Sequence, residues 1–596
     1  MQLNNLALTL LSQYSTEQLI CSIKKIISDR HKLEYDKYFI LSNNTIDIEE
    51  LVRISDYELI KLLEKIFYLG KLSPEERKNT GVVYTPDYIV DYMLKDLPIS
   101  CDKKYIDPSC GCGSFLLRLI VKATEQGINP IDFINNSVYG IDISDDAVDI
   151  TKTSIKLLLI SLGFEPNNLT LNIKSCDSLK NNWKLCFKLS NSFDFIIGNP
   201  PYVKVQSLTK EYYDYLKNTF STTQFGGFNL FYAFIEKSIK EIQSSNGEVR
   251  YIVPNNFLKI KSGKDLRDYI KCNNVLNRIV DFDCNIIFND ILTYNCILWL
   301  KNDSGKEFEY QTIYKTRNLE SEINKITYTK MSIDELDNDA WILNSPQMKE
   351  KIKLIERFPN KLGPMIKTGI ATLKDKAYLI DCVVNNDFYK IVDGKKYKIE
   401  NDLVRKIYRP SDIENHDDIS KNVGYIIFPY KKVNDKNIPF EEDELKTKYP
   451  KAYEYFLSVK DVLATRNGKK GEIKPWFAYG RSQGINNIGP KFIFSPFLDR
   501  PKFIYCQDVD ALLYGFAVYV TNDKEAELLK DFINSGVLKF YIDNTSYSID
   551  GGFKCYQKKY LQNFSFPSFE MINSLKLHSL SKKEKEKVIE DLYFSI

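Results

Sequence analysis

Histidine is scarce in this sequence, with three residues among 596. It is the usual general base near neutral pH and the commonest metal ligand, so its scarcity argues against histidine-based catalysis and His-rich metal sites. The twelve cysteines are scattered, and the one close pair, Cys110 and Cys112, has no second pair to complete a zinc site. We therefore expect no bound metal, and thiols that stay reduced, as in a cytoplasm.

Long apolar runs and a marked charge excess are missing as well. No stretch approaches about 18 apolar residues, and residues 1–15 lack a basic start, which argues against a membrane span and a secretory signal. The net charge is only +3, so any nucleic-acid surface must be a local patch. Hydrophobic residues make up 43% and charged residues 27% of a chain long enough for about two to four globular domains.

The middle of the chain alternates short apolar runs with helical patterns. Between about residues 80 and 300 this alternation predicts a doubly wound α/β fold with a parallel sheet. Before it, residues 1 to about 75 are helical in pattern, and Ser15 is a plausible cap of an amphipathic helix. From about residue 305 the apolar runs become shorter and more polar, which indicates a further domain.

Three of the predicted strands end in an acid, at Asp107, Asp142 and Asp177, and a fourth ends at Asn199. In open parallel α/β sheets, ligands bind outside the carboxyl ends of the strands. A single acid at a strand end is often a helix cap, but a series of three next to a loop with its own chemistry is harder to explain in that way. The series therefore predicts one ligand site at this edge of the sheet.

The loop that starts at Asn199 continues with Pro200, Pro201 and Tyr202. Proline fixes φ and has no N–H, so this loop is stiff and rich in hydrogen-bond acceptors. The Asn199 side-chain carbonyl and a backbone carbonyl can accept both hydrogens of a planar amine, while Tyr202 offers a flat face to a heteroaromatic base. The loop predicts a clamp for an exocyclic amine. The alternative is an ordinary proline turn after a core strand.

A glycine-rich turn, residues 107–113, follows the first predicted strand. It lacks the third glycine of a dinucleotide fingerprint, because Leu116 stands there, and Asp142 lies further on than the usual distance of about 20 residues. An adenosine-containing cofactor without a pyrophosphate fits this turn better. Upstream, Thr85 and Pro86 predict the N-cap and first position of a helix, whose N-terminus can hold a carboxylate; the alternative is a well-capped helix and nothing more.

Basic and aromatic residues interleave in the C-terminal part of the chain. Trp476, Arg481 and Gln483 follow Lys469, Lys470 and Lys474, a composition that suits a nucleic-acid surface. The alternative is a solvated loop around a small aromatic core.

Together and in this order, these stretches resemble the TaqI-like, gamma-class adenine-N6 DNA methyltransferases, including the Eco57I-type modification enzymes, over about residues 78–300. The resemblance implies a Rossmann-like, S-adenosylmethionine-dependent methyltransferase domain at residues 78–305. It further implies a short helical extension at residues 1–77 and a C-terminal α+β target-recognition domain at residues 306–596. The implied reaction transfers a methyl group from S-adenosyl-L-methionine to the exocyclic amine of a flipped-out adenine in a specific sequence of double-stranded DNA. We expect a monomer in the bacterial cytoplasm, with no membrane partner.

The resemblance also assigns residues. Catalytic residues are Asn199, Pro200, Pro201 and Tyr202. Cofactor contacts are Tyr84, Thr85, Pro86, Asp107, Pro108, Ser109, Cys110, Gly111, Gly113, Asp142, Ile143, Asp177, Ser178 and Asn199. DNA contacts are expected at Lys374, Trp476, Arg481 and Gln483. By similarity, Thr85 and Pro86 would lie near the methionine carboxylate together with the 107–113 turn, Asp142 would hold the ribose hydroxyls, and Asp177 would hold the adenine amino group of the cofactor.

The sequence departs from the family pattern at two places. Cys110 and Cys112 stand where Ala and Ser are commoner, which is a small-for-small change. Gly263 stands where the family often has a second aromatic residue against the flipped base, and Phe257 is a candidate substitute.

Three other functions stay open at this point. One is a bifunctional restriction-modification enzyme that also cleaves DNA. Another is methylation of RNA or of a protein glutamine, because enzymes of those kinds carry a similar Asn–Pro–Pro–aromatic clamp. The third is a modification subunit that needs a separate specificity partner; the roughly 290 residues after the catalytic domain exceed a typical domain and favour a built-in recognition domain instead.

Overall fold

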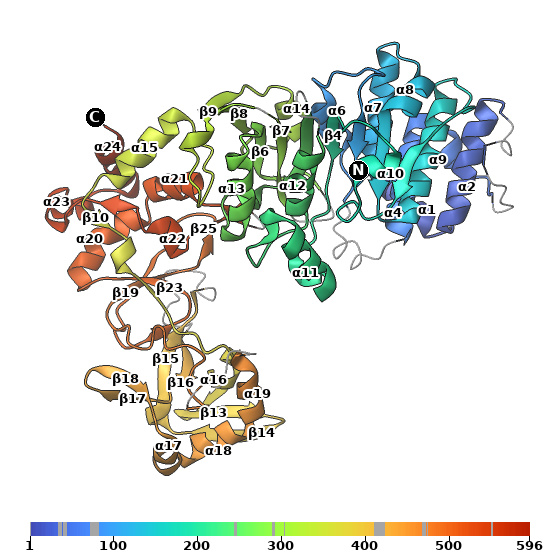
Figure 1. Cartoon of the computed structure of the whole chain (residues 1–596). Helices are drawn as coiled ribbons and strands as arrows, with labels where there is room; N and C mark the ends of the chain where they lie inside the picture. Colours follow the sequence, from blue (N-terminus) through green and yellow to red (C-terminus); the bar gives the residue numbers. More distant parts are fainter. Residues whose placement is uncertain are drawn as a thin grey trace. The chain divides into compact units, whose positions relative to one another are not determined.

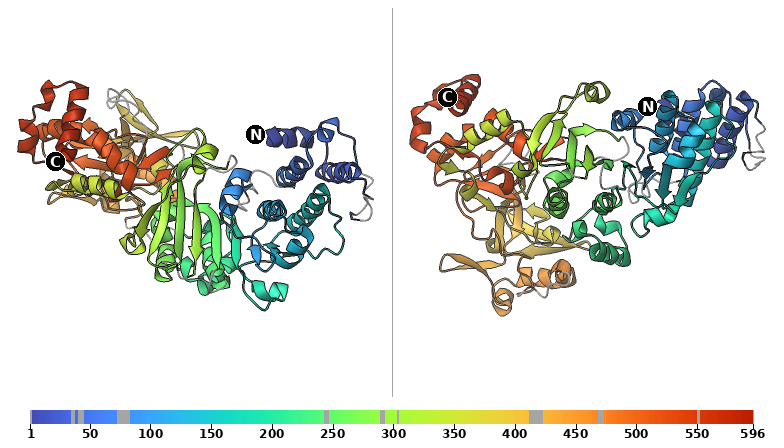
Figure 2. Two further views of the ribbon diagram at one scale, coloured as in Figure 1. Left: turned by 90° about the horizontal axis from the view of Figure 1, so that it is seen from above. Right: turned by 45° about the horizontal axis from the view of Figure 1, so that its top comes forward.

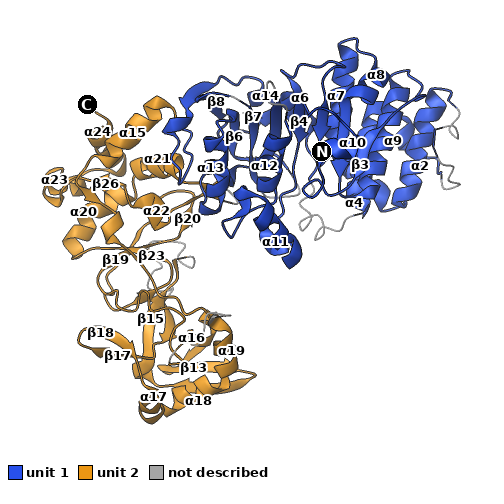
Figure 3. Ribbon diagram, in the orientation of Figure 1, with its two compact units in different colours: residues 1–343 blue, residues 344–596 orange. Residues whose placement is uncertain are grey.

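A computed structural model describes residues 2–33, 38–39, 45–71, 83–242, 247–288, 293–302, 304–410, 423–467, 473, 475–549 and 552–595 (Figure 1). The chain forms two compact units, residues 1–343 and 344–596 (Figure 3). This division lies later than the domain boundary expected at residue 305, because the segment after it adds two strands to the sheet of the first unit. No helix within the described ranges is long and apolar enough to cross a membrane.

A nine-stranded sheet forms the centre of the first unit, in the order β3-β2-β1-β4-β5-β7-β6-β8-β9. Its strands are β1 Tyr105–Asp107, β2 Val138–Asp142, β3 Asn172–Ser175, β4 Phe195–Gly198, β5 Glu248–Pro254, β6 Leu276–Ile286, β7 Tyr294–Lys301, β8 Glu307–Thr312 and β9 Thr329–Ser332. Strands β1 to β5 are mutually parallel, and β7 runs antiparallel between β5 and β6. The doubly wound α/β sheet predicted from the sequence is therefore confirmed.

The strand order places a crossover point at the site of interest. From β1 the chain builds outward through β2 to β3, and it then returns to place β4 on the other side of β1. Loops that leave the carboxyl ends of β1 and β4 consequently diverge, which opens a crevice for ligands in folds of this kind. The residues of β1 and β4 are buried throughout, as expected for parallel strands covered on both faces by helices.

Helices of the first unit surround this sheet and extend to the N-terminus. They are α1 Gln2–Leu11, α2 Thr16–Arg30, α3 Glu49–Val52, α4 Asp56–Lys71, α6 Asp87–Leu94, α7 Ser114–Glu125, α8 Pro130–Ser137, α9 Asp145–Ser161, α10 Trp183–Phe187, α11 Lys210–Thr219, α12 Phe231–Glu241, α13 Lys264–Cys272 and α14 Leu319–Ile323. Ser15 caps α2 in a capping box with Gln18, as the sequence predicts. Helix α4 packs against α1, α2 and α9 (Figure 1 and Figure 2). One hydrophobic core runs through all these elements, so the N-terminal helices share it with the sheet.

The second unit mixes small sheets with helices, which agrees with the α+β character expected there. Its sheets have the orders β11-β23-β19-β21, β12-β13-β14, β16-β15-β22, β20-β25-β24, β10-β26 and β17-β18. The strands are β10 Asn360–Lys361, β11 Ile366–Thr368, β12 Cys382–Val384, β13 Asp387–Val392, β14 Lys395–Ile399, β15 Val404–Tyr408, β16 Gly424–Ile427, β17 Tyr430–Val433, β18 Lys436–Pro439, β19 Lys491–Phe494, β20 Phe497–Leu498, β21 Ile504–Cys506, β22 Leu512–Leu513, β23 Phe516–Tyr519, β24 Ser548–Ile549, β25 Phe553–Cys555 and β26 Ser565–Phe566. The helices are α15 Pro346–Glu356, α16 Asp375–Tyr378, α17 Glu442–Lys448, α18 Pro450–Ser458, α19 Lys460–Ala464, α20 Asp523–Ile533, α21 Gly536–Thr545, α22 Lys558–Leu561, α23 Phe569–Ser574 and α24 Lys582–Phe594. Two large aromatic-rich cores hold these elements.

Candidate active site

The four polar residues predicted at strand ends lie along one edge of four adjacent strands, β3, β2, β1 and β4. Asp107 ends β1 and is only 2% exposed. The neighbouring strand approaches it so closely that a Cβ on Gly198 would lie 2.5 Å from Asp107 Oδ1. Only glycine fits there without moving the carboxylate. The predicted ligand edge is therefore a tightly packed feature of the fold.

The glycine-rich turn after β1 folds back over the carboxyl ends of β1 and β2. Ser109 N donates to Asp107 Oδ1 at 3.0 Å, and Gly111 N donates to Asp142 Oδ2 at 2.8 Å. Asp142 Oδ1 also accepts from Ser144 N at 3.0 Å. The left-handed φ of +92° at Gly113, next to the side chain of Thr151, explains the glycine at that position. The turn thus holds both carboxylates in fixed directions.

The two carboxyl groups are electrostatically unusual. The pKa of Asp107 is raised to about 8, chiefly by burial and also by the nearby Asp142 carboxylate, while hydrogen bonds from Ser109 act to lower it. Burial also raises the pKa of Asp142, against hydrogen bonds from Ser144 and Gly111 that lower it. Each group would be stabilised in its charged form by a positive charge or by hydroxyl donors. This edge therefore favours a cationic ligand that carries hydroxyl groups.

Asn199 has the free acceptor that an amine clamp requires. Its Nδ2 donates to Thr85 Oγ1 at 3.1 Å, whereas its Oδ1 is buried and has no hydrogen-bond partner within the described part of the chain. Buried acceptors are nearly always satisfied, so such an atom calls for a ligand donor or another specific explanation. The backbone carbonyl of Asn199 accepts from Ser109 Oγ at 3.3 Å, which ties the loop to the turn after β1.

The prediction that Thr85 caps a helix is wrong by one position. Helix α6 begins at Asp87, its N-cap is Pro86, and no side chain caps it. The Thr85 side chain is instead used by Asn199, a residue 114 positions later in the chain. Tyr84 OH donates to Asp87 Oδ1 at 3.3 Å. Gly81 and Val82, which lie shortly before Tyr84 in the chain, are outside the described residues.

Tyr202 is held firmly and leaves little surface open. The residue is 8% exposed; its hydroxyl donates to Ile252 O at 3.1 Å and accepts from Asn295 Nδ2 at 3.1 Å. Its ring meets Phe231 and Phe288 edge-on, with centroids 6.3 and 6.1 Å away. The ring is therefore fixed in orientation by hydrogen bonds and packing together. Stacking on a base stays a prediction.

The hydroxyl of Tyr202 should contribute mainly to stability. Tyr202→Phe leaves the Ile252 carbonyl and the buried Asn295 amide each with one partner fewer, which we expect to cost about 1–3 kcal/mol. The thermal unfolding midpoint, followed by circular dichroism, should fall by several degrees. Tyr314→Phe, at a 58% exposed tyrosine, is the matched control. An unchanged midpoint for Tyr202→Phe would contradict the role assigned to these two hydrogen bonds.

Phe257 does not form the second wall of a base pocket, contrary to its candidacy from the sequence. It is fully buried and packs against Phe231 and Trp341. A Cβ on Gly263 would lie 2.3 Å from the Phe257 carbonyl oxygen, so the local backbone excludes a larger residue there. No aromatic residue can replace Gly263 without rebuilding this turn.

The end of β3 supplies Asp177, Ser178 and a partner that the sequence did not suggest. Asp177 Oδ1 accepts from Leu179 N at 2.9 Å and from Tyr212 OH, on α11, at 3.1 Å. Ser178 Oγ donates to Pro108 O at 2.5 Å, linking this turn to the one after β1. Ile143, next to Asp142, is 75% exposed, which is unusual for isoleucine. No local pattern could have predicted Tyr212, because its contact spans 35 residues.

In the second unit, three of the four residues predicted to contact DNA lie on two adjacent segments. Arg481 N donates to Ala371 O at 3.1 Å and Gln483 Nε2 donates to Gly369 O at 3.3 Å, which places both beside the segment that carries Lys374. Trp476 makes other contacts: its Nε1 donates to Glu442 Oε1 at 2.9 Å and its ring packs against Phe456 and Phe477. Lys469, Lys470 and Lys474 lie outside the described residues.

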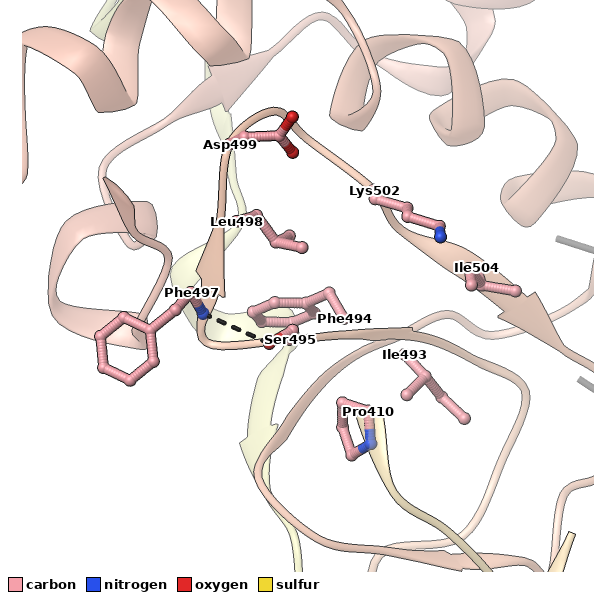
Figure 4. Close-up of a pocket in the computed structure, with 9 residues that line it drawn as sticks. All are labelled: Pro410, Ile493, Phe494, Ser495, Phe497, Leu498, Asp499, Lys502 and Ile504. Atoms are coloured by element: carbon pink, nitrogen blue, oxygen red, sulfur yellow. Dashed lines mark hydrogen bonds between the residues drawn. The ribbon is translucent and has the colours of Figure 1, made fainter. Parts of the chain in front are cut away.

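A cavity of about 250 Å³ also occurs in the second unit (Figure 4). It is lined by Pro410, Ile493, Phe494, Ser495, Phe497, Leu498, Asp499, Lys502 and Ile504. None of the predicted site residues is among them. The chemistry indicated by the sequence is thus concentrated at the sheet edge of the first unit.

Comparison with known proteins bears on this edge directly. Residues 136–288 match the family model of the Eco57I restriction-modification methylase. The Type II restriction enzyme and methyltransferase RM.Eco57I of Escherichia coli is 27% identical over 519 residues, which cover 74% of this chain and 50% of that protein. The Type II methyltransferase M.BstVI of Geobacillus stearothermophilus is 24% identical over 573 residues, which cover 86% of this chain and 92% of that protein. The chain therefore spans half the length of the first relative and most of the second.

One solved structure is similar over almost the whole chain. The Type IIL restriction-modification enzyme MmeI, solved in complex with DNA, has a TM-score of 0.57 at 12% sequence identity, covering 97% of this chain and 87% of that chain. This likeness shows a shared fold. It confirms the α/β fold with an additional C-terminal part that the sequence predicts. The family model and the sequence relatives confirm the resemblance to Eco57I-type methylases.

Proposed function

We propose that the chain is a site-specific DNA methyltransferase that transfers the methyl group of S-adenosyl-L-methionine to the exocyclic amine of adenine. The observation that carries the proposal is the buried Oδ1 of Asn199, which has no hydrogen-bond partner among the residues that the structure describes. Asn199 begins a stiff Asn–Pro–Pro–Tyr loop at the carboxyl edge of the sheet. The similarity to Type II methyltransferases and to a restriction-modification enzyme in complex with DNA supports it.

The residues at the sheet edge fit S-adenosylmethionine by their chemistry. The cofactor supplies an electrophilic methyl group on a positively charged sulfur, and it carries an ammonium group, a carboxylate and two ribose hydroxyls. Asp107 and Asp142 provide the negative charge and the hydroxyl acceptors, and the exposed Ile143 provides an apolar surface for a flat ring. Asp177 would accept from the adenine amino group of the cofactor.

The Asn–Pro–Pro–Tyr loop would activate the substrate amine by hydrogen bonding. Asn199 Oδ1 and the Pro200 carbonyl would accept the two amine hydrogens, which turns the nitrogen lone pair out of conjugation with the ring. Bound S-adenosylmethionine would supply the methyl group to this nitrogen, the electron pair of the broken carbon–sulfur bond would stay on its sulfur, and the surplus proton of the amine would pass to water. Catalysis in this scheme rests on positioning and on preorganised acceptors rather than on a strong base.

Reaching an adenine in duplex DNA requires that the base leave the stack, at a cost of a few kcal/mol. Tyr202 would then stack on the extruded base through the part of its ring that remains exposed. Sequence recognition would belong to the part of the chain after the catalytic domain, with Lys374, Arg481 and Gln483 as contacts from two adjacent segments and Trp476 as a fourth. We expect one chain to act alone.

A bifunctional enzyme that also cleaves DNA is the second candidate, because RM.Eco57I is both a restriction enzyme and a methyltransferase. The chain spans 50% of that protein but 92% of M.BstVI, which is a methyltransferase by name. Methylation is the activity that the names of both relatives share. Methylation of RNA or of a protein glutamine is a weaker alternative, since the relatives named above are restriction-modification enzymes.

The decisive test is methylation-sensitive long-read sequencing of DNA from a methylation-free bacterium that expresses the chain, with Asn199→Ala expressed in parallel. We expect modified adenines within one repeated sequence context, and none with the variant. Unmodified DNA in spite of soluble, cofactor-binding protein would overturn the stand-alone enzyme and turn attention to a specificity partner or to RNA and protein substrates. Cleaved DNA after addition of Mg²⁺ to the purified protein would establish the bifunctional alternative.

A further inference from the structure

A buried lysine of the N-terminal helices reaches the motif that begins at Tyr84. Lys61, on α4, has a side chain that is only 3% exposed. Its Nζ lies 3.0 Å from Asp87 Oδ1 and 3.2 Å from Glu64 Oε2, and 5.0 Å from the centroid of the Tyr84 ring. A fully buried lysine is rare unless it is paired, and Lys61 is paired with two carboxylates at once.

The same cluster also contacts the helix that follows the glycine-rich turn. Lys61 Nζ lies 3.5 Å from the hydroxyl of Ser114, the first residue of α7, and that hydroxyl donates to Glu64 Oε1. Lys61 and Glu64 are one turn apart on α4. This part of α4 therefore contacts both segments that are predicted to surround the methionine end of the cofactor. One segment comes just before α6 and the other just before α7.

Lys61 is connected to the amine clamp through a short chain of contacts. Asp87 accepts from both Lys61 and the Tyr84 hydroxyl, and Lys65 lies 3.8 Å from the centroid of the Tyr84 ring. The next residue, Thr85, accepts the hydrogen bond that orients Asn199. Burial alone would lower the pKa of Lys61, but Glu64, Tyr84 and Asp87 hold it above its ordinary value, so the ammonium stays charged.

We propose that Lys61 is a positioning residue of the cofactor site, and that α4 is for this reason part of the catalytic machinery. Its ammonium holds Asp87, Tyr84 and Ser114 in place next to the segment expected to receive the cofactor carboxylate, while its own charge is compensated by Asp87 and Glu64. This inference rests on the proposed use of S-adenosylmethionine. It gives the N-terminal helices a role that the sequence pattern did not suggest.

The test measures cofactor binding separately from DNA binding in the full chain. Lys61→Met should raise the Kd for S-adenosylmethionine, measured by isothermal titration calorimetry without DNA, by about tenfold or more. The Kd for double-stranded DNA should stay within twofold. Lys71→Met is the matched control, because Lys71 lies on the same helix with a 52% exposed side chain that pairs with Asp146 at the surface.

A purely structural role would lower the unfolding midpoint and leave the cofactor Kd of the folded protein unchanged, and that outcome would overturn the proposal. If Lys61→Met does not fold, Asp87→Asn decides the question. Asp87 is 42% exposed in its side chain, so its neutralisation is tolerable, and we expect a three- to tenfold rise in cofactor Kd; an unchanged Kd would again overturn the proposal. Wild-type protein that fails to bind S-adenosylmethionine would instead contradict the proposed function itself.

Discussion

Asn199→Ala is expected to lower kcat for adenine methylation by about 10²–10³-fold, the loss typical of one preorganised polar group aimed at a developing charge. The variant removes a buried side-chain oxygen that has no hydrogen-bond partner among the described residues, and with it an acceptor for the substrate amine. The cavity left is small and lies in a loop braced by two prolines, so the fold should persist. Cofactor affinity should fall much less than turnover.

Single-turnover kinetics with radiolabelled cofactor and a duplex that contains the recognition sequence would measure this loss. Asn136→Ala is the matched control, because Asn136 is an exposed asparagine of α8 whose side-chain amide donates to Asp132 O of the same helix. Thr85→Val tests the same arrangement from the other side. Without the Thr85 hydroxyl the Asn199 amide loses the partner that orients it, so an intermediate loss of kcat is expected. Full turnover in Asn199→Ala would contradict the amine clamp.

The strands and their polar ends were predictable because their signals are local. Each of Asp107, Asp142 and Asn199 ends a short apolar run, and the rule that ligands bind at the carboxyl ends of parallel strands brings such residues together without further information. The turn after β1 was predictable for the same reason, since its glycines and its acid are consecutive in the chain. The structure adds which atoms are satisfied and which are free.

What the sequence could not predict depends on contacts between distant segments. Thr85 looks like a helix cap when only its neighbours are considered, but its hydroxyl is engaged by Asn199, far along the chain. Lys61 looks like one more polar residue on an amphipathic helix until the fold buries it against Asp87 and Glu64.

The domain boundary shows the same limit. Strand β8 alternates polar and apolar residues, which makes it look like the start of a new domain, yet Phe308 and Tyr310 are buried against the sheet and the strand pairs in parallel with β6. A pattern read along the chain cannot distinguish one more strand of the same sheet from the first strand of the next domain. The division into units at residue 343 follows from this pairing.

Asp107→Asn should separate stability from cofactor binding, with opposite effects on the two. The pKa of Asp107 is about 8 in the folded chain, whereas its ordinary value is 3.8. At any pH between these two values the folded chain therefore binds a proton at Asp107 that the unfolded chain has lost. The contribution of this group to stability is therefore present at low pH and is lost as pH rises toward 8, by about 1.4 kcal/mol for each pH unit. Asparagine has nearly the same shape and does not titrate.

Without cofactor, the unfolding midpoint of Asp107→Asn should therefore rise relative to that of the wild type by about 5 °C or more between pH 5 and pH 8. Above pH 8 this difference in midpoint should stay constant. S-adenosylmethionine should raise the unfolding midpoint of the wild type, because the positive charge of the cofactor compensates the buried Asp107 carboxylate. It should not raise the midpoint of the variant, because asparagine carries no charge for the cofactor to pair with. Thermal unfolding across this pH range, with and without the cofactor, measures both effects; Asp132→Asn, at an exposed acid of α8, is the control. A constant difference in midpoint between pH 5 and 8 would show that Asp107 is ionised throughout this range. Equal stabilisation of both proteins by the cofactor would show that Asp107 is not part of the cofactor-binding site.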